Sequence, residues 1–409
     1  MKRTGIMIVA GDPSGDANAA ALVRALAGAL PAAQFQITGD AQPLTASLAP
    51  RFFGAGGPEM AAAGVELELD LTAHAVIGLG GLMRKLPLFR RLLGRLAGLA
   101  AERQPELIIL VDYGGFNLRL ARAVRNYVRA RTGPFFNWRP KIVQFISPQV
   151  WASRPGRAKR MARDYDLVLS LFPFEKKWFA GSAPGLPVEF VGHPIFDRYP
   201  DRRRAETAGR DSQPPAVLLL PGSRRGELKR HVPVMREAAD LIAARQPARF
   251  RMIVPDETMA ALARTLLPAG PAGIDLQTGG LAEALSNATM AITKTGTITL
   301  ECAYFGVPAV AIYKADWLTY FGGRRLVNVQ YLSMPNLLAD QAIYPELIQG
   351  HATAANIAAA ALELLGSPAR RDEIRAKLAL VIESLGGPGA ARRAAAAILQ
   401  IMDPAQRGR

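Results

Sequence analysis

Three loops carry residues whose types and spacing suit the binding of a phosphate or a sugar-nucleotide. They span residues 11–16, 221–227 and 295–301, and each follows a short apolar run and opens a helical pattern. A helix N-terminus presents unpaired N–H groups and a partial positive charge, so each junction can receive an anion. The loops fall in different halves of the chain. This favours a reaction held in a cleft between two nucleotide-binding folds.

The first loop reads GDPSGD and is neither a dinucleotide fingerprint nor a Walker loop. Its glycine spacing differs from both, and no lysine follows Gly15. The carboxylates of Asp12 and Asp16 disfavour direct phosphate binding and favour sugar hydroxyls or amides as ligands. The alternative is a glycine turn in which Ser14 or Asp16 caps the helix.

A fourth candidate, Asp112, follows the apolar run 107–111 and precedes Gly114 and Gly115. Ligands of open α/β sheets bind beyond the carboxyl ends of the strands, and glycines permit close approach. Asp112 is therefore a candidate general base. The alternative is that it caps a helix starting near Phe116.

The loop at 221–227 reads PGSRRGE. Gly222 allows a ligand to approach the backbone, Ser223 can cap the helix, and Arg224 can bind a phosphate through two hydrogen bonds. We predict phosphate binding here. A surface turn rich in arginine would show the same pattern.

The third loop begins with Thr295, Gly296 and Thr297, and Glu301 lies one to two turns into the helix. The helix start can face phosphates while the Glu301 carboxylate accepts hydrogen bonds from both ribose hydroxyls. Glu301 could instead be an ordinary surface residue. Its apolar neighbours disfavour that alternative, because unpaired carboxylates are seldom buried.

Residues 75–99 mix large apolar residues with arginine and lysine and contain almost no acid. Basic amphipathic stretches of this kind lie on anionic membrane surfaces. A core-packing helix with a basic outer face is the alternative, and Pro87 must start or bend any helix there. The residues predicted to face the membrane are Met83, Arg84, Lys85, Leu88, Phe89, Arg90 and Arg91.

Composition narrows the possible partners and compartment. The 409 residues carry a formal charge of +16, which favours an anionic partner, although an arginine-rich surface alone could explain it. The dispersed basic residues match no nucleic-acid-binding motif. No signal peptide or membrane-spanning run is visible, so we expect a cytoplasmic protein.

The cysteine and histidine content argues against a metal site. A single cysteine, Cys302, excludes an intrachain disulfide and a cysteine-cluster metal centre, and we predict that it is a core residue. The four histidines are scattered. His193, in a Gly-His-Pro sequence, is interpreted as a structural hinge residue near the junction of two domains.

Apolar runs alternate with helical stretches along the chain, which is typical of parallel α/β architecture. We expect two Rossmann-like domains, at 1–200 and 201–380, with a C-terminal helix at 381–409 that crosses back to the N-terminal domain. The segment 198–215 is expected to be a linker. The expected strands are 6–10, 51–54, 107–111, 141–146, 167–171, 188–191, 217–220, 250–254, 274–277, 290–293 and 307–312.

Nine ordered segments, at compatible spacing over nearly the whole chain, resemble the lipid-A-disaccharide synthase family of GT-B glycosyltransferases. They are AGDPSGD (10–16), FFGAGGPEMAAAG (52–64), VDYGGFNLRLA (111–121), ISPQVWASRPGR (146–157), DLVLSLFPFEKKWF (166–179), FVGHPIFD (190–197), LLPGSRRGEL (219–228), TGTITLE (295–301) and MPNLLAD (334–340).

The resemblance implies a metal-free, cofactor-free, inverting transfer. UDP-2,3-diacylglucosamine would donate its sugar to 2,3-diacylglucosamine 1-phosphate, giving a β-1,6-linked disaccharide and UDP. Asp112 would be the base and Arg224 would neutralise the leaving diphosphate. Glu301 and Asn336 would contact the nucleotide, and Asp12 and Ser14 the acceptor. The basic stretch would face the inner surface of the cytoplasmic membrane.

The chain departs from the family pattern at four places. Asp12 replaces a usual Glu, Thr295 replaces a Ser and follows an additional cation, Lys294, and Ser153 replaces a second Trp. Gly80 and Gly81 stand where a Glu is usual.

The departures leave open a related transferase with another acceptor. A UDP-sugar epimerase of the same fold and a non-catalytic protein binding anionic lipid are further alternatives. The sequence also leaves open the acyl chain length, a homodimeric state, and whether Asp112 or Asp12 takes the proton.

Overall fold

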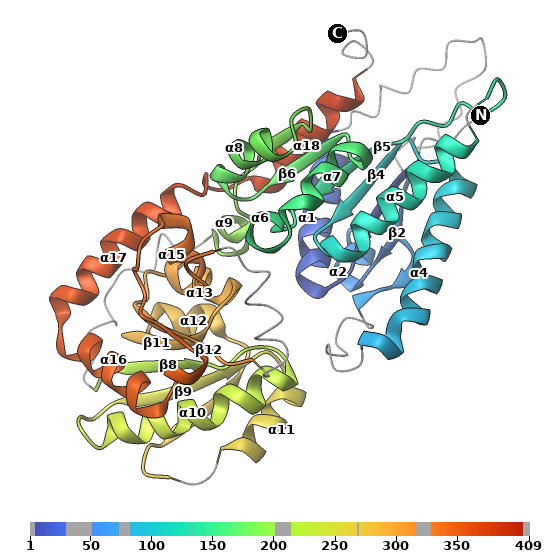
Figure 1. Cartoon of the computed structure of the whole chain (residues 1–409). Coiled ribbons are helices and arrows are strands. Elements are labelled where there is room, and N and C mark those ends of the chain that lie inside the picture. The colour runs from blue at the N-terminus through green and yellow to red at the C-terminus, as the bar shows by residue number, and fades with distance from the viewer. Residues whose placement is uncertain are drawn as a thin grey trace. The chain divides into compact units, whose positions relative to one another are not determined.

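The computed structural model describes residues 5–29, 51–72, 82–131, 133–200, 214–267, 270–315 and 329–403. The chain forms two compact units. The first unit comprises residues 1–194 and 387–409, and the second comprises residues 195–386 (Figure 1). The sequence placed these boundaries at 200 and 380. Residues 201–213, most of the expected linker, lie outside the described residues.

The first unit contains a parallel sheet of seven strands in the order β3-β2-β1-β4-β5-β6-β7. The strands are β1 (Gly5–Ala10), β2 (Arg51–Gly56), β3 (Glu66–Asp70), β4 (Leu107–Val111), β5 (Lys141–Phe145), β6 (Leu167–Ser170) and β7 (Val188–Phe190). Its helices are α1 (Pro13–Ala29), α2 (Pro58–Ala62), α4 (Leu82–Arg103), α5 (Gly114–Ala130), α6 (Val150–Ser153), η1 (Pro155–Arg157), α7 (Ala158–Asp164), α8 (Pro173–Ser182) and α18 (Ala390–Met402).

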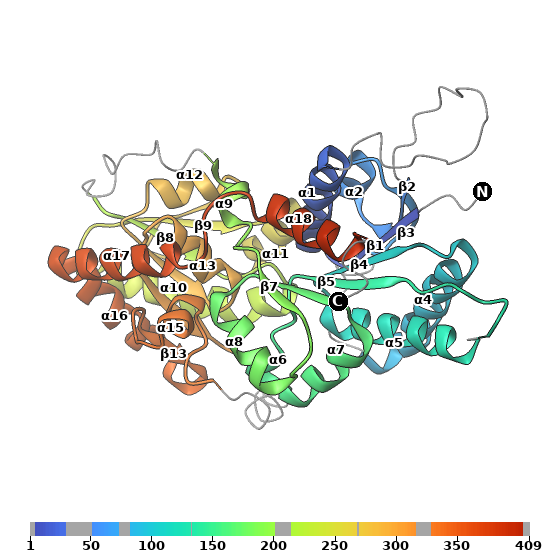
Figure 2. The ribbon, with the colours of Figure 1, turned by 90° about the horizontal axis from the view of Figure 1, so that it is seen from above.

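The central strands are apolar throughout because each side of this sheet faces its own core. Met7 and Ile108 point into a core closed by α4, α5, α7 and α8. Ile8 and Ile109 point into a second core, closed by α1 and α18. Figure 2 shows α1 and α18 on one side of the sheet and α4, α5 and α7 on the other.

The C-terminal helix α18 belongs to the first unit, although it follows the whole of the second unit in sequence. Ala394, Ala395 and Ile398 are fully or almost fully buried in the same core as the apolar face of α1. Arg393 secures the entry to this helix, because its guanidinium donates to the carbonyls of Val191 at 2.7 Å, Pro388 at 2.6 Å and Gly387 at 3.0 Å.

The second unit contains a parallel sheet of six strands in the order β10-β9-β8-β11-β12-β13. The strands are β8 (Ala216–Leu220), β9 (Arg249–Val254), β10 (Ile274–Thr278), β11 (Met290–Lys294), β12 (Ala309–Tyr313) and β13 (Glu346–Ile348). The helices are α9 (Ile195–Arg198), α10 (Arg225–Ala243), α11 (Glu257–Leu266), α12 (Leu281–Ser286), α13 (Thr297–Tyr304), α15 (Met334–Ala339), η3 (Gln349–His351), α16 (Ala354–Gly366) and α17 (Pro368–Glu383).

Both units are Rossmann-like α/β folds with parallel sheets, so the predicted fold class is confirmed. In each unit the central strand (β1 or β8) lies beside a later strand (β4 or β11) at the point where the strand order reverses. Open α/β sheets bind ligands beyond the carboxyl ends of the strands at this point. All three loops singled out in the sequence, and Asp112, follow these four strands.

Candidate functional site

Asp112 directly follows β4, next to the end of β1, since Val111 is paired with Ala10. Asp112 and Tyr113 have φ values of 49° and 44°, a left-handed conformation that is uncommon outside glycine and clusters at functional sites. The turn is held by its backbone. The Asp112 N–H donates to Phe145 O at 2.9 Å, and Asp112 O accepts from Asn117 Nδ2 at 2.8 Å.

The Asp112 carboxyl is a stronger base than an ordinary aspartate. Burial, together with the nearby negative charge of Asp12, raises its pKa to about 6, against a smaller lowering effect of the Tyr113 N–H. It does not cap α5, because the N-cap position belongs to Tyr113 and no side chain caps that helix. The capping alternative for Asp112 was therefore wrong.

The residue that caps α1 is Asp12, not Ser14 or Asp16 as the sequence suggested. Asp12 Oδ1 accepts the Gly15 N–H at 2.7 Å, whereas the Ser14 side chain is exposed. The Asp16 carboxylate is buried and accepts the N–H groups of three residues at the start of α2. These are Gly57 at 2.8 Å, Glu59 at 3.0 Å and Met60 at 3.2 Å.

Two glycines let the loops around Asp112 pack closely. A Cβ added at Gly11 would lie 2.2 Å from the Tyr113 ring, and one added at Gly114 would lie 2.5 Å from Pro148. The ends of β1, β4 and β5 are thereby brought together. The sequence did not predict this packing of Gly11, Tyr113 and Pro148.

A buried carboxyl that the sequence did not reveal supports the loop after β5. Glu175, on α8, is 1% exposed and accepts from Trp151 Nε1 at 3.0 Å and from the Phe172 N–H at 3.3 Å. Burial raises its pKa to about 7, and these hydrogen bonds oppose the shift. Glu175 therefore positions Trp151, two residues before the substituted Ser153.

In the second unit, the loop after β8 wraps around the carboxylate of Glu227. Glu227 Oε2 accepts the N–H groups of Ser223 at 2.9 Å and Arg224 at 3.3 Å. Gly222 has φ +120°, and a Cβ there would lie 2.3 Å from the same oxygen. The backbone donors predicted for a phosphate are thus taken by Glu227, whereas the Arg224 side chain is 67% exposed.

Glu227 also joins this loop to the one after β11. Lys294 Nζ lies 3.4 Å from Glu227 Oε1 and 3.1 Å from the position of a Cβ on Gly296. Burial alone would raise the pKa of Glu227, but Lys294, the Ser223 N–H and Arg224 lower it overall. The two loops predicted to bind phosphate are therefore neighbours, with Arg224 and Lys294 as their cations.

The helix α13 begins at Thr297, with Gly296 at its N-cap in a conformation of φ +119°. Thr295 is buried and Thr297 is exposed. No side chain caps this helix, so its first N–H groups point toward the end of the sheet without a side-chain acceptor.

Glu301 is mostly buried and is paired with Arg198, whose Nη1 lies 3.1 Å from Glu301 Oε1. Burial raises the pKa of Glu301, and Arg198 and Tyr199 oppose this rise. Burial, followed by the charge of Glu301, raises the pKa of Tyr199 to about 12. Glu301 is therefore not an ordinary surface residue, and Arg198 and Tyr199 are partners that the sequence did not reveal.

The structure does not support a nucleotide contact for Asn336. Its side chain is fully buried, and Nδ2 donates to Tyr344 O at 2.8 Å and Glu346 Oε1 at 2.9 Å. Its Oδ1 accepts the N–H groups of Ile343 at 3.0 Å and Tyr344 at 2.8 Å. Because all its polar atoms are occupied, Asn336 fixes the connection between α15 and β13.

His231 on α10 supports the loop after β8 through contacts of both its ring nitrogens. Its Nδ1 lies 2.7 Å from Pro221 O, and its Nε2 lies 3.2 Å from the Lys314 N. Burial lowers its pKa, and a neutral ring with the proton on Nδ1 satisfies both contacts. His231, which looked isolated in the sequence, thus ties β8 to the segment after β12.

Of the predicted membrane residues, Leu88, Arg90 and Arg91 are exposed on α4. Phe89 packs against the core, with its ring 4.8 Å from that of Phe116. Residues 83–85 belong to α4, which continues through Pro87, and residues 75–81 lie outside the described residues. In the part of the chain that the structure describes, no helix is long and apolar enough to cross a membrane.

Two further predictions concern single residues. Cys302 is fully buried on α13, which confirms it as a core residue, and burial raises its pKa. His193 packs against Phe172, with ring centroids 5.8 Å apart, just before the boundary between the units. Within the described ranges, no three His, Cys, Asp or Glu side chains converge to hold a metal ion.

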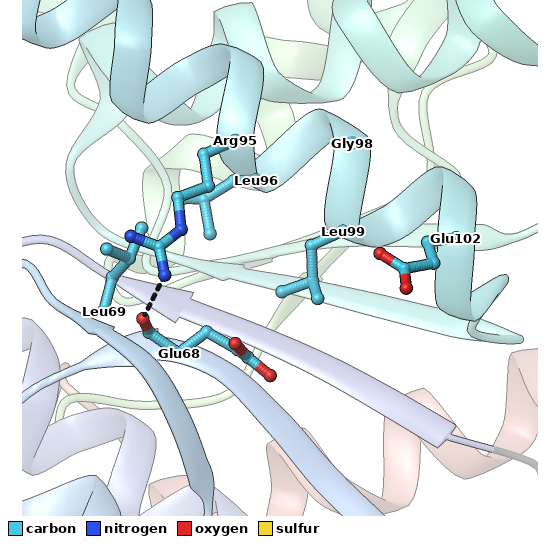
Figure 3. A pocket seen from close by; sticks show the side chains of 7 residues that line it. All are labelled: Glu68, Leu69, Arg95, Leu96, Gly98, Leu99 and Glu102. Carbon is cyan, nitrogen blue, oxygen red and sulfur yellow. Dashed lines mark hydrogen bonds between the residues drawn. The ribbon is translucent and has the colours of Figure 1, made fainter.

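A small pocket of about 290 Å³ lies between β3 and α4, away from the loops described above. Arg95 Nη2 donates a hydrogen bond to the Glu68 carbonyl at 3.3 Å. Figure 3 shows this bond between two residues that line the pocket. The lining includes Leu69, Leu99 and Glu102 but none of the predicted acceptor or nucleotide residues.

Comparisons with known proteins point to one family. A family model described as lipid-A-disaccharide synthetase matches residues 6–401. The lipid-A-disaccharide synthase of Geobacter sulfurreducens is 36% identical over 402 residues, covering 97% of each chain.

Solved structures share the fold at low identity. CalG4, the calicheamicin glycosyltransferase, has a TM-score of 0.58 at 17% identity, covering 99% of this chain and 100% of that one. UDP-GlcNAc 2-epimerase from Neisseria meningitidis, bound to UDP-GlcNAc, has a TM-score of 0.58 at 11% identity, covering 97% and 99%.

Proposed function

The chain belongs to the lipid-A-disaccharide synthetase family, and from this premise we propose the reaction that it catalyses and the residues that perform it. It is a glycosyltransferase of lipid A synthesis. We propose that UDP-2,3-diacylglucosamine is the donor and 2,3-diacylglucosamine 1-phosphate the acceptor. The products are a β-1,6-linked disaccharide 1-phosphate and UDP.

The observation that carries the proposed mechanism is the basic carboxylate of Asp112 at the end of β4. A pKa of about 6 leaves this group ionised at neutral pH, yet more basic than an ordinary aspartate. Asp112 takes the proton from the acceptor 6-hydroxyl as that oxygen attacks the anomeric carbon. The bond from this carbon to the diphosphate oxygen breaks on the opposite face, so the anomeric centre inverts.

Asp12 has a supporting role in this mechanism. Its negative charge helps to raise the pKa of Asp112, and its Oδ1 is already bonded to the Gly15 N–H. Asp12 therefore tunes the base and leaves proton removal to Asp112. Ser14, exposed beside it, contacts the acceptor sugar.

On the nucleotide side, the exposed Arg224 side chain and the uncapped start of α13 bind the diphosphate. Fixed positive charge that faces the leaving group stabilises the transition state without reorganisation. The N–H groups of Thr297 and its neighbours add to Arg224, because those of Ser223 and Arg224 are held by Glu227. Gly222, Gly296 and Thr295 shape the loops.

Glu301 binds the ribose hydroxyls. Its pairing with Arg198 opposes the rise in pKa that burial causes and fixes the carboxylate on the second turn of α13. A carboxylate held in this way can accept a hydrogen bond from each hydroxyl. Because Asp112 and Glu301 lie in different units, the proposed reaction needs both units.

We propose that the start of α4 contacts the inner face of the cytoplasmic membrane. Leu88, Arg90 and Arg91 are exposed there and combine apolar surface with positive charge. Both proposed substrates carry acyl chains that sit in a bilayer. A peripheral contact of this kind gives the sugar head groups access to the site.

The experiment that tests this function is UDP release by the purified protein in detergent micelles with both lipid substrates. We expect release that depends on the acceptor and is lost in Asp112→Asn. Glu106→Gln is the matched control, because Glu106 is exposed at the opposite end of β4. Conversion of the UDP-sugar without acceptor would indicate an epimerase, and absence of UDP release would contradict the proposal.

A further inference from the structure

Four arginines gather beside the loop that carries Asp112. Arg119 lies on α5, Arg154 precedes η1, Arg157 ends it, and Arg160 lies on α7. Burial and then the charges of the other three lower the pKa of Arg157, as expected where guanidinium groups crowd together. We call these four residues the arginine cluster.

The positive charge of this cluster is not neutralised by neighbouring carboxylates within the described residues. Among the described residues, none of the four guanidinium groups pairs with a carboxylate, whereas the nearby Arg125 pairs with Asp166. Arg157 is half-buried and the others are exposed. Concentrated like charge without counter-charge destabilises a fold and attracts an anion.

The cluster lies next to the loop of the proposed base. Arg119 is on α5, which begins at Gly114 directly after this loop, and its Nη1 donates to the Gly115 carbonyl in the first turn of the same helix at 2.6 Å. Gly114 packs against Pro148, which begins the segment leading to Arg154. The backbone N–H of Arg157 donates to Arg154 O at 3.0 Å, so this segment turns back on itself.

The other side of the cluster meets α4. The Arg119 guanidinium lies 5.7 Å from the centroid of the Phe89 ring, and Phe89 packs edge-on against Phe116. Arg119 therefore stands between the loop of Asp112 and the helix proposed to contact the membrane. A lipid-linked sugar that reached Asp112 along α4 would pass this position.

We propose that the arginine cluster is a binding subsite for the phosphate monoester of the sugar acceptor. This inference rests on the proposed function. A phosphate monoester carries close to two negative charges on three oxygens, and guanidinium groups match it with paired hydrogen bonds. Binding the phosphate at one end of the sugar holds the hydroxyl at the other end against Asp112.

The phosphate of a bilayer headgroup shares this chemistry, but the position of the cluster favours the acceptor. Arg119 lies on α5, the helix that begins directly after Tyr113 of the catalytic loop, and Arg157 is half-buried, whereas the exposed Arg90 and Arg91 on α4 are the cations proposed to meet headgroups. The cluster therefore distinguishes a phosphorylated acceptor from an unphosphorylated one.

The test is the KM of Arg157→Gln for two acceptors in nonionic detergent micelles, with saturating donor. The acceptors are 2,3-diacylglucosamine 1-phosphate and 2,3-diacylglucosamine without the phosphate. We expect the KM for the phosphorylated acceptor to rise about tenfold, equivalent to about 1.4 kcal/mol, with the donor KM unchanged. The unphosphorylated acceptor should be equally poor for wild type and variant.

Arg163→Gln is the matched control, because Arg163 is exposed on α7, the helix that follows Arg157, and lies outside the cluster. Arg157→Lys, which keeps the charge, should recover part of the affinity, and thermal unfolding checks that each variant folds. An equal loss with both acceptors, or no loss, would overturn the proposal. So would an unchanged KM with lost binding to phosphatidylglycerol vesicles, which would assign the cluster to lipid headgroups.

A direct binding measurement separates this proposal from the proposed reaction. If the wild type releases no UDP, titration of micellar 2,3-diacylglucosamine 1-phosphate still reports the subsite. Weaker binding by Arg157→Gln than by Arg163→Gln would support the subsite even then. Equal binding by the two variants would contradict it.

Discussion

Lys294 and Glu227 form an ion pair that joins the end of β11 to the first turn of α10, with Nζ 3.4 Å from Oε1. Their side chains are 17% and 15% exposed, so water screens the pair only in part. The ammonium also lies over Gly296 at the start of α13. A cation beside the positive end of a helix is unfavourable unless an anion is present, and Glu227 is the anion here.

Replacing Lys294 by Met should weaken UDP binding about tenfold. The variant removes one of two cations at the proposed diphosphate site and leaves Arg224, 3.4 Å away, as the cation paired with Glu227, so less positive charge faces the phosphates. Lys229→Met is the control, because Lys229 is exposed on α10. Calorimetric titration with UDP measures both affinities, and an unchanged affinity in Lys294→Met would exclude the residue from the site.

Activity should decline as the pH falls through about 6, because protonation of Asp112 removes the base. Asp12→Asn takes away a negative charge that raises this pKa, so the acid limb should move to lower pH. Asparagine can still cap α1, which keeps the fold. The measurement is the pH profile of kcat/KM, and an acid limb that stays in place or moves upward in Asp12→Asn would contradict the assignment.

Gly222→Ala should destabilise the second unit by about 1–3 kcal/mol. The backbone there has φ +120°, and the new Cβ would lie 2.3 Å from Glu227 Oε2. Gly226→Ala is the control. Gly226 lies in the first turn of α10, where a Cβ would approach only the mobile end of Arg230. Chemical unfolding compares the two, and equal midpoints would disprove the strain.

His231 should make stability depend on pH below neutrality. Its folded pKa is lowered by burial below the ordinary 6.5, so protons bind the unfolded chain more readily. The free energy of unfolding therefore falls as the pH drops from about 6.5 toward the folded pKa. His231→Gln should flatten this dependence, while His351→Gln, at an exposed site, should not. Unfolding curves between pH 5 and 7.5 measure the slopes.

The sequence predicted eleven of the thirteen strands that the described residues form, including the edge strands β7 and β10, and missed β3 and β13. The central run 107–111 is apolar throughout, which makes it visible. Residues 66–70 read ELELD, and 346–348 form a three-residue strand. Both lie at sheet edges, where short, charged strands limit pairing with other chains and leave a weak apolar signal.

The candidate residues could be predicted because loops that follow parallel strands share one edge of the sheet. The side-chain partners of these residues could not be predicted. Asp16 binds the N–H of Gly57, 41 residues away, and Trp151 donates to Glu175, 24 residues away. Lys294 meets Glu227 across 67 residues. Such contacts depend on which strands are neighbours, and a local pattern of residue types does not encode that order.

The position of α18 reverses the usual order of folding during synthesis. Domains generally fold as they emerge from the ribosome, the N-terminal one first. Here the core beneath α1 needs Ala394, Ala395 and Ile398, which are translated after every strand of the second unit. The first unit to be made therefore completes its core last, and until then the side of this core that α18 closes stays open. A nascent chain of this protein must shield that apolar face for almost its entire translation.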